Sequence, residues 1–265
     1  TAFDLNYEVP YVKGLELKAT VSYDPRFAQA KSLAKDFVLY DYDLENETYD
    51  ETAFNKPAWI RNDYNNSKLL TLQAQANYKT TIANNHNVAG LLVFEQREQT
   101  GRSAFIRKFY DFYTNDQIDQ ATDTNAESGG NEVTIRNMSY IGKLNYDYKG
   151  KYLLELIARY DGSYRYHPDV RWGLFPSVSG GWRISDEAFM QDISWLSNLK
   201  LRASYGVVGQ DAGAPFQYIP AFSTTGGGTY EFEEGILTNG AATPSIVNKE
   251  LTWMESKIVD FGIEL

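Results

Sequence analysis

The 265-residue chain contains no cysteine and only two histidines. Without thiols it can form no disulfide framework, no zinc–thiolate centre and no cysteine nucleophile. His86 lies in a polar turn and His167 precedes a proline, and neither belongs to a metal-binding or catalytic motif. We expect both to be solvent-facing loop residues. The sequence also lacks a serine-hydrolase elbow, so it indicates no enzyme, and no bound cofactor is expected.

Long hydrophobic runs are also missing. A transmembrane helix needs about 20 consecutive apolar residues, and the longest apolar run here is confined to residues 88–94, with a mean hydropathy of −0.46. A helical membrane protein is therefore excluded. A membrane β-barrel is not, because its strands alternate apolar and polar residues and escape hydropathy windows.

Positive charge is scarce: 25 basic against 35 acidic residues give a net charge of −10. This balance argues against nucleic acid as a partner, because nucleic-acid binding needs a basic surface. Part of the acidic excess has a spacing that suggests calcium, but an EF-hand loop starting at Asp41 would need Gly and Glu where Asn46 and Thr52 stand. We therefore interpret this acidic group as part of a solvated loop: Asp41, Asp43, Glu45 and Glu47.

What the chain has in quantity is aromatic residues, 20 Tyr, 14 Phe and 5 Trp, and segments with a period of two. Apolar and polar side chains alternate over residues 152–161, and aromatics mark both ends of residues 172–184. This is typical of strands with one apolar and one polar face, in a soluble hairpin or across a membrane. The same pattern predicts nine strands, at residues 3–9, 15–23, 70–78, 88–98, 140–148, 152–161, 172–184, 199–207 and 253–265.

The alternation also predicts which side chains share a face. We expect one set to face lipid: Leu70, Leu72, Ala74, Leu199, Leu201 and Ala203. We expect a second set to face a wet lumen: Gln73, Gln75, Lys200 and Arg202. A further set of carboxylates could form an acid–base pair, but lumen-lining charge is the simpler interpretation: Asp147, Glu155 and Asp161. Three strand glycines are candidates for bulges or tight curvature: Gly142, Gly180 and Gly181.

The predicted connectors alternate between short and long. Residues 10–14, 81–87, 149–150 and 185–198 are short, the last with a helical turn near residues 187–191, whereas residues 24–66, 100–137, 162–171 and 209–252 are mostly longer. Outer-membrane barrels have short periplasmic turns and long external loops, so this parity favours such a barrel. One long loop is unusually aromatic, and its rings can either hold sugars or a partner or, as we favour, form a small core: Phe105, Phe109, Tyr110, Phe112 and Tyr113.

Residues 138–208 resemble the barrel of the SusC/RagA family of TonB-linked outer-membrane transporters of Bacteroidota. The resemblance is carried by DYKGKYLLELIARYDGSYRY, RWGLFPSVSGGWRIS and FMQDISWLSNLKLRASYGVVGQ, with LNYEVPYVKGLELKATVSYD and LTWMESKIVDFGIEL at the two ends. It implies nutrient uptake across the bacterial outer membrane. Its partners would be a SusD-like surface lipoprotein, the TonB complex and outer-membrane lipid, and its substrate a glycan, oligosaccharide or peptide.

We therefore expect an all-β fold, an antiparallel transmembrane β-barrel that is partial. Nine is an odd number, whereas such transporters have about 22 strands around a plugged lumen. Residues 1–265 are thus expected to be an internal barrel segment without the plug domain through which TonB acts. The alternative is a soluble or surface-attached all-β module that binds carbohydrate through loop aromatics. The sequence assigns no individual substrate-binding residue to either.

Overall fold

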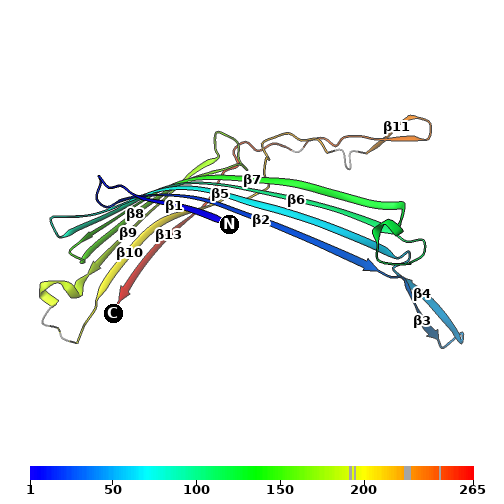
Figure 1. Ribbon diagram of the computed structural model, residues 1–265, viewed down its shortest axis with the longest axis horizontal. Helices are drawn as coiled ribbons and strands as arrows, with labels where there is room; N and C mark the ends of the chain where they lie inside the picture. Colours follow the sequence, from blue (N-terminus) through cyan, green and yellow to red (C-terminus); the bar gives the residue numbers. More distant parts are fainter. Residues whose placement is uncertain (191–192, 194, 224–227, 245) are drawn as a thin grey trace. The chain divides into compact units, whose positions relative to one another are not determined.

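The computed structural model describes residues 1–190, 193, 195–223, 228–244 and 246–265. The fold is all-β, as predicted, and nine strands form one antiparallel sheet in the order β1-β2-β5-β6-β7-β8-β9-β10-β13 (Figure 1). The nine are β1 (Ala2–Glu8), β2 (Leu15–Ala34), β5 (Trp59–Ile82), β6 (His86–Phe109), β7 (Thr122–Tyr148), β8 (Tyr152–Ser163), β9 (Trp172–Arg183), β10 (Lys200–Gln210) and β13 (Met254–Glu264). Within the described ranges no helix is long and apolar enough to cross a membrane.

The chain divides into two compact units. Unit 1 comprises Thr1, Tyr23–Leu70 and Glu98–Ile135. Unit 2 comprises Ala2–Ser22, Thr71–Arg97 and Arg136–Leu265. All nine strands contribute to unit 2, where β1 and β13 are the two edges of the sheet. In the part of the chain that is described these edges do not pair with each other, so the sheet is open, as expected.

The register gives unit 2 two chemically distinct faces. In one cross-strand row Leu144 lies opposite Leu156, which lies opposite Val178. One residue further along, Asn145 lies opposite Glu155, which lies opposite Ser179. Because successive side chains of a strand point to opposite faces, the first row belongs to an apolar outer face and the second to a polar inner face.

The outer face is not covered by protein within the described residues. Leu144, Leu156 and Val178 stay 41%, 40% and 39% exposed although they are apolar and lie in the centre of the sheet. Ala74 belongs to this face, since it lines the same shallow apolar hollow as Leu92 and Leu174. Leu201 and Ala203 belong to this face as predicted, because they lie opposite Trp182 and Gly180. Leu70 and Leu72 alternate with Ala74 along β5 and so share its side of the strand, whereas Leu199 precedes β10 and is not a strand residue.

Short turns connect the strands at one end of unit 2. In the β7–β8 turn Lys149 and Gly150 have φ values of 54° and 71° and the Lys151 amide donates to the Tyr148 carbonyl, which is a type I′ turn. The β5–β6 turn lies beside it, because the Lys149 amide donates to the Asn85 carbonyl at 2.8 Å. The longer β9–β10 connector contains two 3₁₀ turns, η2 (Ile184–Asp186) and η3 (Ala188–Met190), near the predicted helical turn, whose last residue, Gln191, lies outside the described residues.

Two of the four predicted long loops, residues 24–66 and 100–137, prove to be mostly strand, whereas residues 162–171 and 209–252 are mostly loop where they are described. In unit 1, β2 continues to Ala34, β6 to Phe109, and β7 begins at Thr122. The interval between β2 and β5 forms a separate hairpin of β3 (Phe37–Asp43) and β4 (Thr48–Phe54). The interval between β10 and β13 contains another, β11 (Thr229–Glu233) and β12 (Ile236–Asn239), while Gly227 lies outside the described residues. The prediction was wrong because backbone pairing continues where both strand faces are polar and the alternation is lost.

A small core does form among the aromatics between β6 and β7, as favoured. Tyr110 is 2% exposed and packs with Ala58, Ile60 and Ala121, and its hydroxyl donates to the Gln117 carbonyl at 3.1 Å. Tyr113 packs against this cluster, whereas Phe112 is 77% exposed. Phe105 and Phe109 are not loop residues: they belong to β6 and stack with Arg61 and Arg107.

No bulge occurs at the three predicted strand glycines, since the register runs without a shift through Gly142, Gly180 and Gly181. Close approach matters instead at two other glycines, Gly209 and Gly173. A Cβ on Gly209 would meet the Phe175 ring, and one on Gly173 would lie 2.5 Å from it. The Phe175 ring therefore lies flat against two glycine backbones and is only 5% exposed.

Candidate functional site

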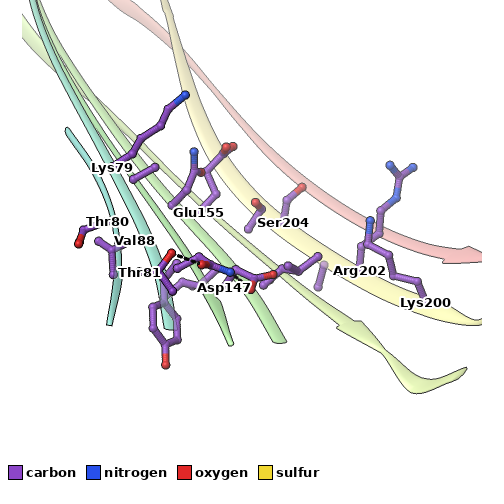
Figure 2. A pocket seen from close by; sticks show the side chains of 18 of the residues that line it. Lys79, Thr80, Thr81, Val88, Asp147, Glu155, Lys200, Arg202 and Ser204 are labelled. Atoms are coloured by element: carbon purple, nitrogen blue, oxygen red, sulfur yellow. Dashed lines mark hydrogen bonds between the residues drawn. The ribbon is translucent and has the colours of Figure 1, made fainter. Parts of the chain in front are cut away.

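The inner face of unit 2 encloses a hollow of about 1100 Å³. Figure 2 shows Lys79, Glu155 and Arg202 projecting into it from different strands. Its lining combines polar and apolar side chains, and the polar members come from seven strands and one turn: Lys13, Lys79, Thr80, Thr81, Asn87, Asn145, Asp147, Glu155, Ser179, Lys200, Arg202, Ser204 and Asp260.

Charges on this face are arranged in pairs of opposite sign. Lys143 lies 2.5 Å from Glu155, and Lys200 and Arg202 lie 3.4 Å and 3.8 Å from Glu264. The predicted lumen residues Lys200 and Arg202 thus belong to the polar face. Gln73 does too, because its amide donates to Glu95 at 3.1 Å and accepts from Gln75 at 2.6 Å. Paired charges and neutral amides make a wet surface that carries little net charge to hold one ligand tightly.

The carboxylates predicted to line the lumen are held separately. Asp147 accepts hydrogen bonds of 3.0 Å from the Asn87 amide and from the Gly150 backbone. Asp161 pairs with Arg159 at 3.1 Å, and Glu155 pairs with Lys143. Because each has its own partner, the geometry supports their interpretation as wall charge rather than as an acid–base pair.

The histidines are placed differently from one another. His86 begins β6 instead of facing solvent in a turn: its Nδ1 lies 2.8 Å from the Tyr146 hydroxyl and its ring packs on Tyr148 at 4.7 Å. The prediction was wrong because the strand starts earlier and brings His86 beside two tyrosines. His167 is in a loop, as predicted, with its ring edge-to-face with Tyr218.

The acidic hairpin has a structural explanation. Asp43 ends β3 and accepts hydrogen bonds from the Glu45 amide at 2.8 Å and the Asn46 side chain at 2.7 Å, and these bonds hold the pKa of its carboxyl below the usual value. It therefore closes the β3–β4 turn. Over the described ranges no group of three or more His, Cys, Asp or Glu side chains is placed to hold a metal ion.

Two aromatic rows mark two levels of the outer face. At the short-turn end Tyr148 stacks on Tyr152, which stacks on Trp182, with ring centroids 6.2 Å and 6.4 Å apart. At the other end Tyr160 stacks on Trp172 at 4.8 Å, and Tyr140 lies beside Trp172 at 6.0 Å. Aromatic rows flanking an apolar band are typical of both lipid–water interfaces of an outer-membrane barrel.

The end of unit 2 opposite the short turns is closed by packed loops. Asp211 accepts hydrogen bonds from the Ser163 hydroxyl at 3.1 Å and from Arg165 at 3.2 Å. Tyr166 is 1% exposed, exchanges hydrogen bonds with the Ala212 backbone, and packs edge-on against Trp253. The sequence analysis did not predict this cluster, because loop aromatics that are more than 80 residues apart leave no local pattern.

A second unpredicted feature lies in unit 1. The Arg107 guanidinium stacks on both Trp59 and Phe109, at 4.5 Å and 4.8 Å from the ring centroids. Arg61 stacks on Phe105 at 3.8 Å and pairs with Asp63. Such cation–π layers stabilise neighbouring strands where apolar packing is sparse, which is how a polar wall stays ordered.

Residues 2–265 match the family model described as TonB dependent receptor-like, beta-barrel. The chain belongs to this TonB-dependent receptor family. Its two-faced sheet is accordingly part of a TonB-dependent barrel. It is 31% identical over 200 residues to a TonB-dependent receptor of Formosa agariphila, a match covering 71% of this chain and 18% of the relative. It is 35% identical over 128 residues to the TonB-dependent receptor SusC of Bacteroides thetaiotaomicron, covering 48% of this chain and 13% of SusC.

Solved structures show the same TonB-dependent barrel fold. The RagAB peptide importer in its closed-closed state superposes with a TM-score of 0.78 at 21% identity, over 99% of this chain and 27% of the other. The RagAB peptide transporter gives a TM-score of 0.76 at 22% identity, over 95% of this chain and 26% of the other. The matched region therefore spans 18% and 13% of these two curated relatives and about a quarter of these structures. The expected SusC/RagA resemblance is confirmed at the level of the family.

Proposed function

We propose that residues 1–265 are a wall segment of a TonB-dependent transporter in the bacterial outer membrane. The whole transporter imports glycans, oligosaccharides or peptides, takes substrate from a SusD-like surface lipoprotein, and is driven by the TonB complex through a plug domain outside this barrel segment. The observation that carries the proposal is the exposed apolar outer face between two aromatic rows, backed by a polar inner face.

Energetics favour this proposal over a soluble carbohydrate-binding module. Apolar surface that stays exposed to water lacks the stabilisation of about 25 cal/mol per square ångström that burial would give. A contiguous exposed patch of this kind therefore promotes association. Lipid removes that cost, while the paired charges of the inner face keep it hydrated. The polar wall suits passage of a hydrophilic solute better than permanent retention, because opposite charges neutralise one another along it.

Uptake by whole cells tests the proposal. Cells expressing the full-length protein with its neighbouring lipoprotein would be given labelled peptides and labelled oligosaccharides, with and without a protonophore that removes the energy TonB needs. We expect energy-dependent uptake of one substrate class that is lost on deletion of the transporter. Equal uptake by the deletion strain for both classes would contradict the proposal.

A further inference from the structure

We propose that the β3–β4 hairpin of unit 1 is a docking surface for basic peptides, whose lysine and arginine side chains are attracted by its tyrosines and carboxylates. This inference rests on the proposed function, because it names the substrate class of the same transporter. The hairpin is a two-stranded sheet of its own, so among the described residues each of its strands is paired on one side only. Each strand therefore has a free edge.

The net negative charge of the chain comes from two hairpins. The chain has 35 acidic and 25 basic residues, which gives the net charge of −10. Residues 36–54 contain seven of the acidic residues, residues 228–240 contain three, and neither segment contains a basic residue. The rest of the chain is therefore balanced, with 25 residues of each sign. The β3–β4 hairpin carries the larger share of the excess, so its surface attracts cations.

The carboxylates of this hairpin also lack the ion pairs found elsewhere in unit 1. Six carboxylates outside the hairpin lie within 3.4 Å of a lysine or arginine nitrogen, among them Asp63 and Asp116. Within the described part of the chain, no ion pair forms at Asp41, Asp50 or Glu51. Asp41 and Asp50 are direct cross-strand partners, and like charges in that position repel one another. A cation bound between them would relieve this repulsion.

The tyrosines occupy the opposite face of the hairpin. Tyr42 is the cross-strand partner of Tyr49, with ring centroids 5.1 Å apart, and Tyr40 lies opposite Glu51. Tyr40, Tyr42 and Tyr49 are 62%, 49% and 70% exposed. The faces of such rings attract ammonium and guanidinium groups. Tyr40 and Glu51 thus present a ring and a carboxylate side by side to one basic side chain.

An extended peptide fits this hairpin better than other ligands do. Successive side chains of a strand point to opposite faces, so a basic peptide paired along the hairpin would place them alternately over the tyrosines and over the Asp41–Asp50 pair. Its backbone would bond to the unpaired N–H and C=O groups of the free edge, as in strand addition. A polyamine has no backbone for that edge, and a neutral glycan gains nothing from the charge.

Peptide binding to the purified full-length transporter in detergent tests the proposal. The probe is a fluorescent peptide that alternates lysine with serine, and the comparison is a peptide that alternates glutamate with serine. Fluorescence anisotropy measures the binding of each. The double variant Asp41→Asn/Asp50→Asn removes the opposed charges, and Asp111→Asn, at an exposed carboxylate of unit 1 outside the hairpin, is the matched control. Because the double variant removes a repulsion, the hairpin should stay folded, and hydrogen exchange of residues 37–54 checks this.

A second variant tests the rings separately. Tyr42→Thr/Tyr49→Thr removes the cation–π surface while keeping side chains that favour strands. Its control is Tyr11→Thr, which changes a tyrosine that is 94% exposed in the turn between β1 and β2. We expect each double variant to bind the lysine peptide about three- to tenfold more weakly than the wild type. Both controls should bind it as the wild type does, and added salt should weaken binding throughout.

Two outcomes would overturn the docking surface. One is equal affinity of the wild type for the lysine and glutamate peptides, and the other is unchanged affinity for the lysine peptide in both double variants. Loss of the neighbouring lipoprotein from the aspartate variant, without any loss of peptide affinity, would show a protein-docking surface instead and also overturn the proposal. Energy-dependent uptake by cells that persists in these cases would leave the proposed function intact.

Discussion

The Tyr152 hydroxyl donates a 2.7 Å hydrogen bond to the carboxylate of Glu187, which lies 35 residues later in the chain. This bond, followed by that from the Trp182 indole, holds the pKa of Glu187 below its usual value. It ties a connector that is not itself part of the sheet to an aromatic row that is.

Removing the charge of Glu187 should matter at neutral pH and not in acid. A carboxyl whose pKa is lower in the folded state contributes stability above its unfolded pKa, and loses it as pH falls through the folded pKa. Glu187→Gln should therefore lower the thermal midpoint at pH 7, and the difference should shrink as the pH falls from the usual glutamate pKa through the lower pKa of folded Glu187. Melting of the full-length protein in detergent from pH 3.5 to 7.5 measures this. A difference of equal size at every pH would show that the charge is not involved.

Arginine should be costly on the outer face and tolerated one position away. Leu144 lies in the middle of the apolar band, and Asn145 is its neighbour on the inner face, opposite Glu155. Leu144→Arg should cost about 2–4 kcal/mol of folding free energy, as for a charge near the centre of a bilayer. Asn145→Arg should cost little, because Asn145 lines the hollow of the inner face, where water can solvate the charge. Urea titration of protein folded into vesicles compares the two, and similar costs would disprove the assignment of faces.

Gly209 should not accept a methyl group. Its Cβ would overlap the Phe175 ring, so Gly209→Ala should destabilise by about 1–3 kcal/mol through overpacking. Adding Phe175→Leu should restore part of the loss. Gly90→Ala is the matched control, because a Cβ there meets nothing within 4 Å. The urea midpoints of the four proteins test this, and equal effects at Gly209 and Gly90 would contradict it.

Tyr110 should keep the segment between β6 and β7 folded. Tyr110→Ala should remove about 3–5 kcal/mol of packing from the unit 1 core, whereas Tyr110→Phe should lose only the hydrogen bond to Gln117, about 1 kcal/mol. Hydrogen exchange of residues 110–121 in the full-length protein reports the difference. The control is exposed Phe112→Ala, which should alter exchange little; faster exchange in that variant alone would refute the assignment.

Labelling of intact cells should separate the two sets of connectors. Cysteines at Asn115 and Glu234 replace residues in or near the long connectors, and cysteines at Lys13 and Lys149 lie in short turns. An impermeant maleimide should label the first pair and leave the second unlabelled until the cells are lysed. Labelling of Lys13→Cys or Lys149→Cys in intact cells would reverse the proposed topology.

The sequence predicted the nine-stranded sheet because nine strands pass between two different environments. Leu154 and Glu155 show why. The Leu154 side chain lies on the outer face and the Glu155 side chain on the inner face, so apolar and polar residues alternate along the strand. The same physics explains the failures. Along β5, Arg61, Asn62 and Asp63 are all polar, so no period of two marks a strand there although its pairing continues.

The site itself was predicted only in outline. Alternation identified Lys200 and Arg202 as wall residues, but their shared partner Glu264 lies 64 and 62 positions away and could be found only from the register. The buried contacts of Tyr166 likewise depend on loops that meet from distant parts of the chain, and the stacking of Arg107 on Trp59 joins two different strands. Long-range pairing of this kind leaves no local signal.

The separation of the two aromatic rows sets the membrane thickness that this wall accepts. Tyr152 and Tyr160 are eight positions apart on β8, or about 27 Å along the strand, and a tilt of roughly 40° reduces this to about 20 Å across the membrane. Most bilayers have hydrocarbon cores near 30 Å, and the bacterial outer membrane is thinner than average. Transport measured after reconstitution will therefore depend on acyl-chain length. Short-chain lipids match the separation of the two rows, whereas a bilayer of long-chain lipids must become thinner around the protein.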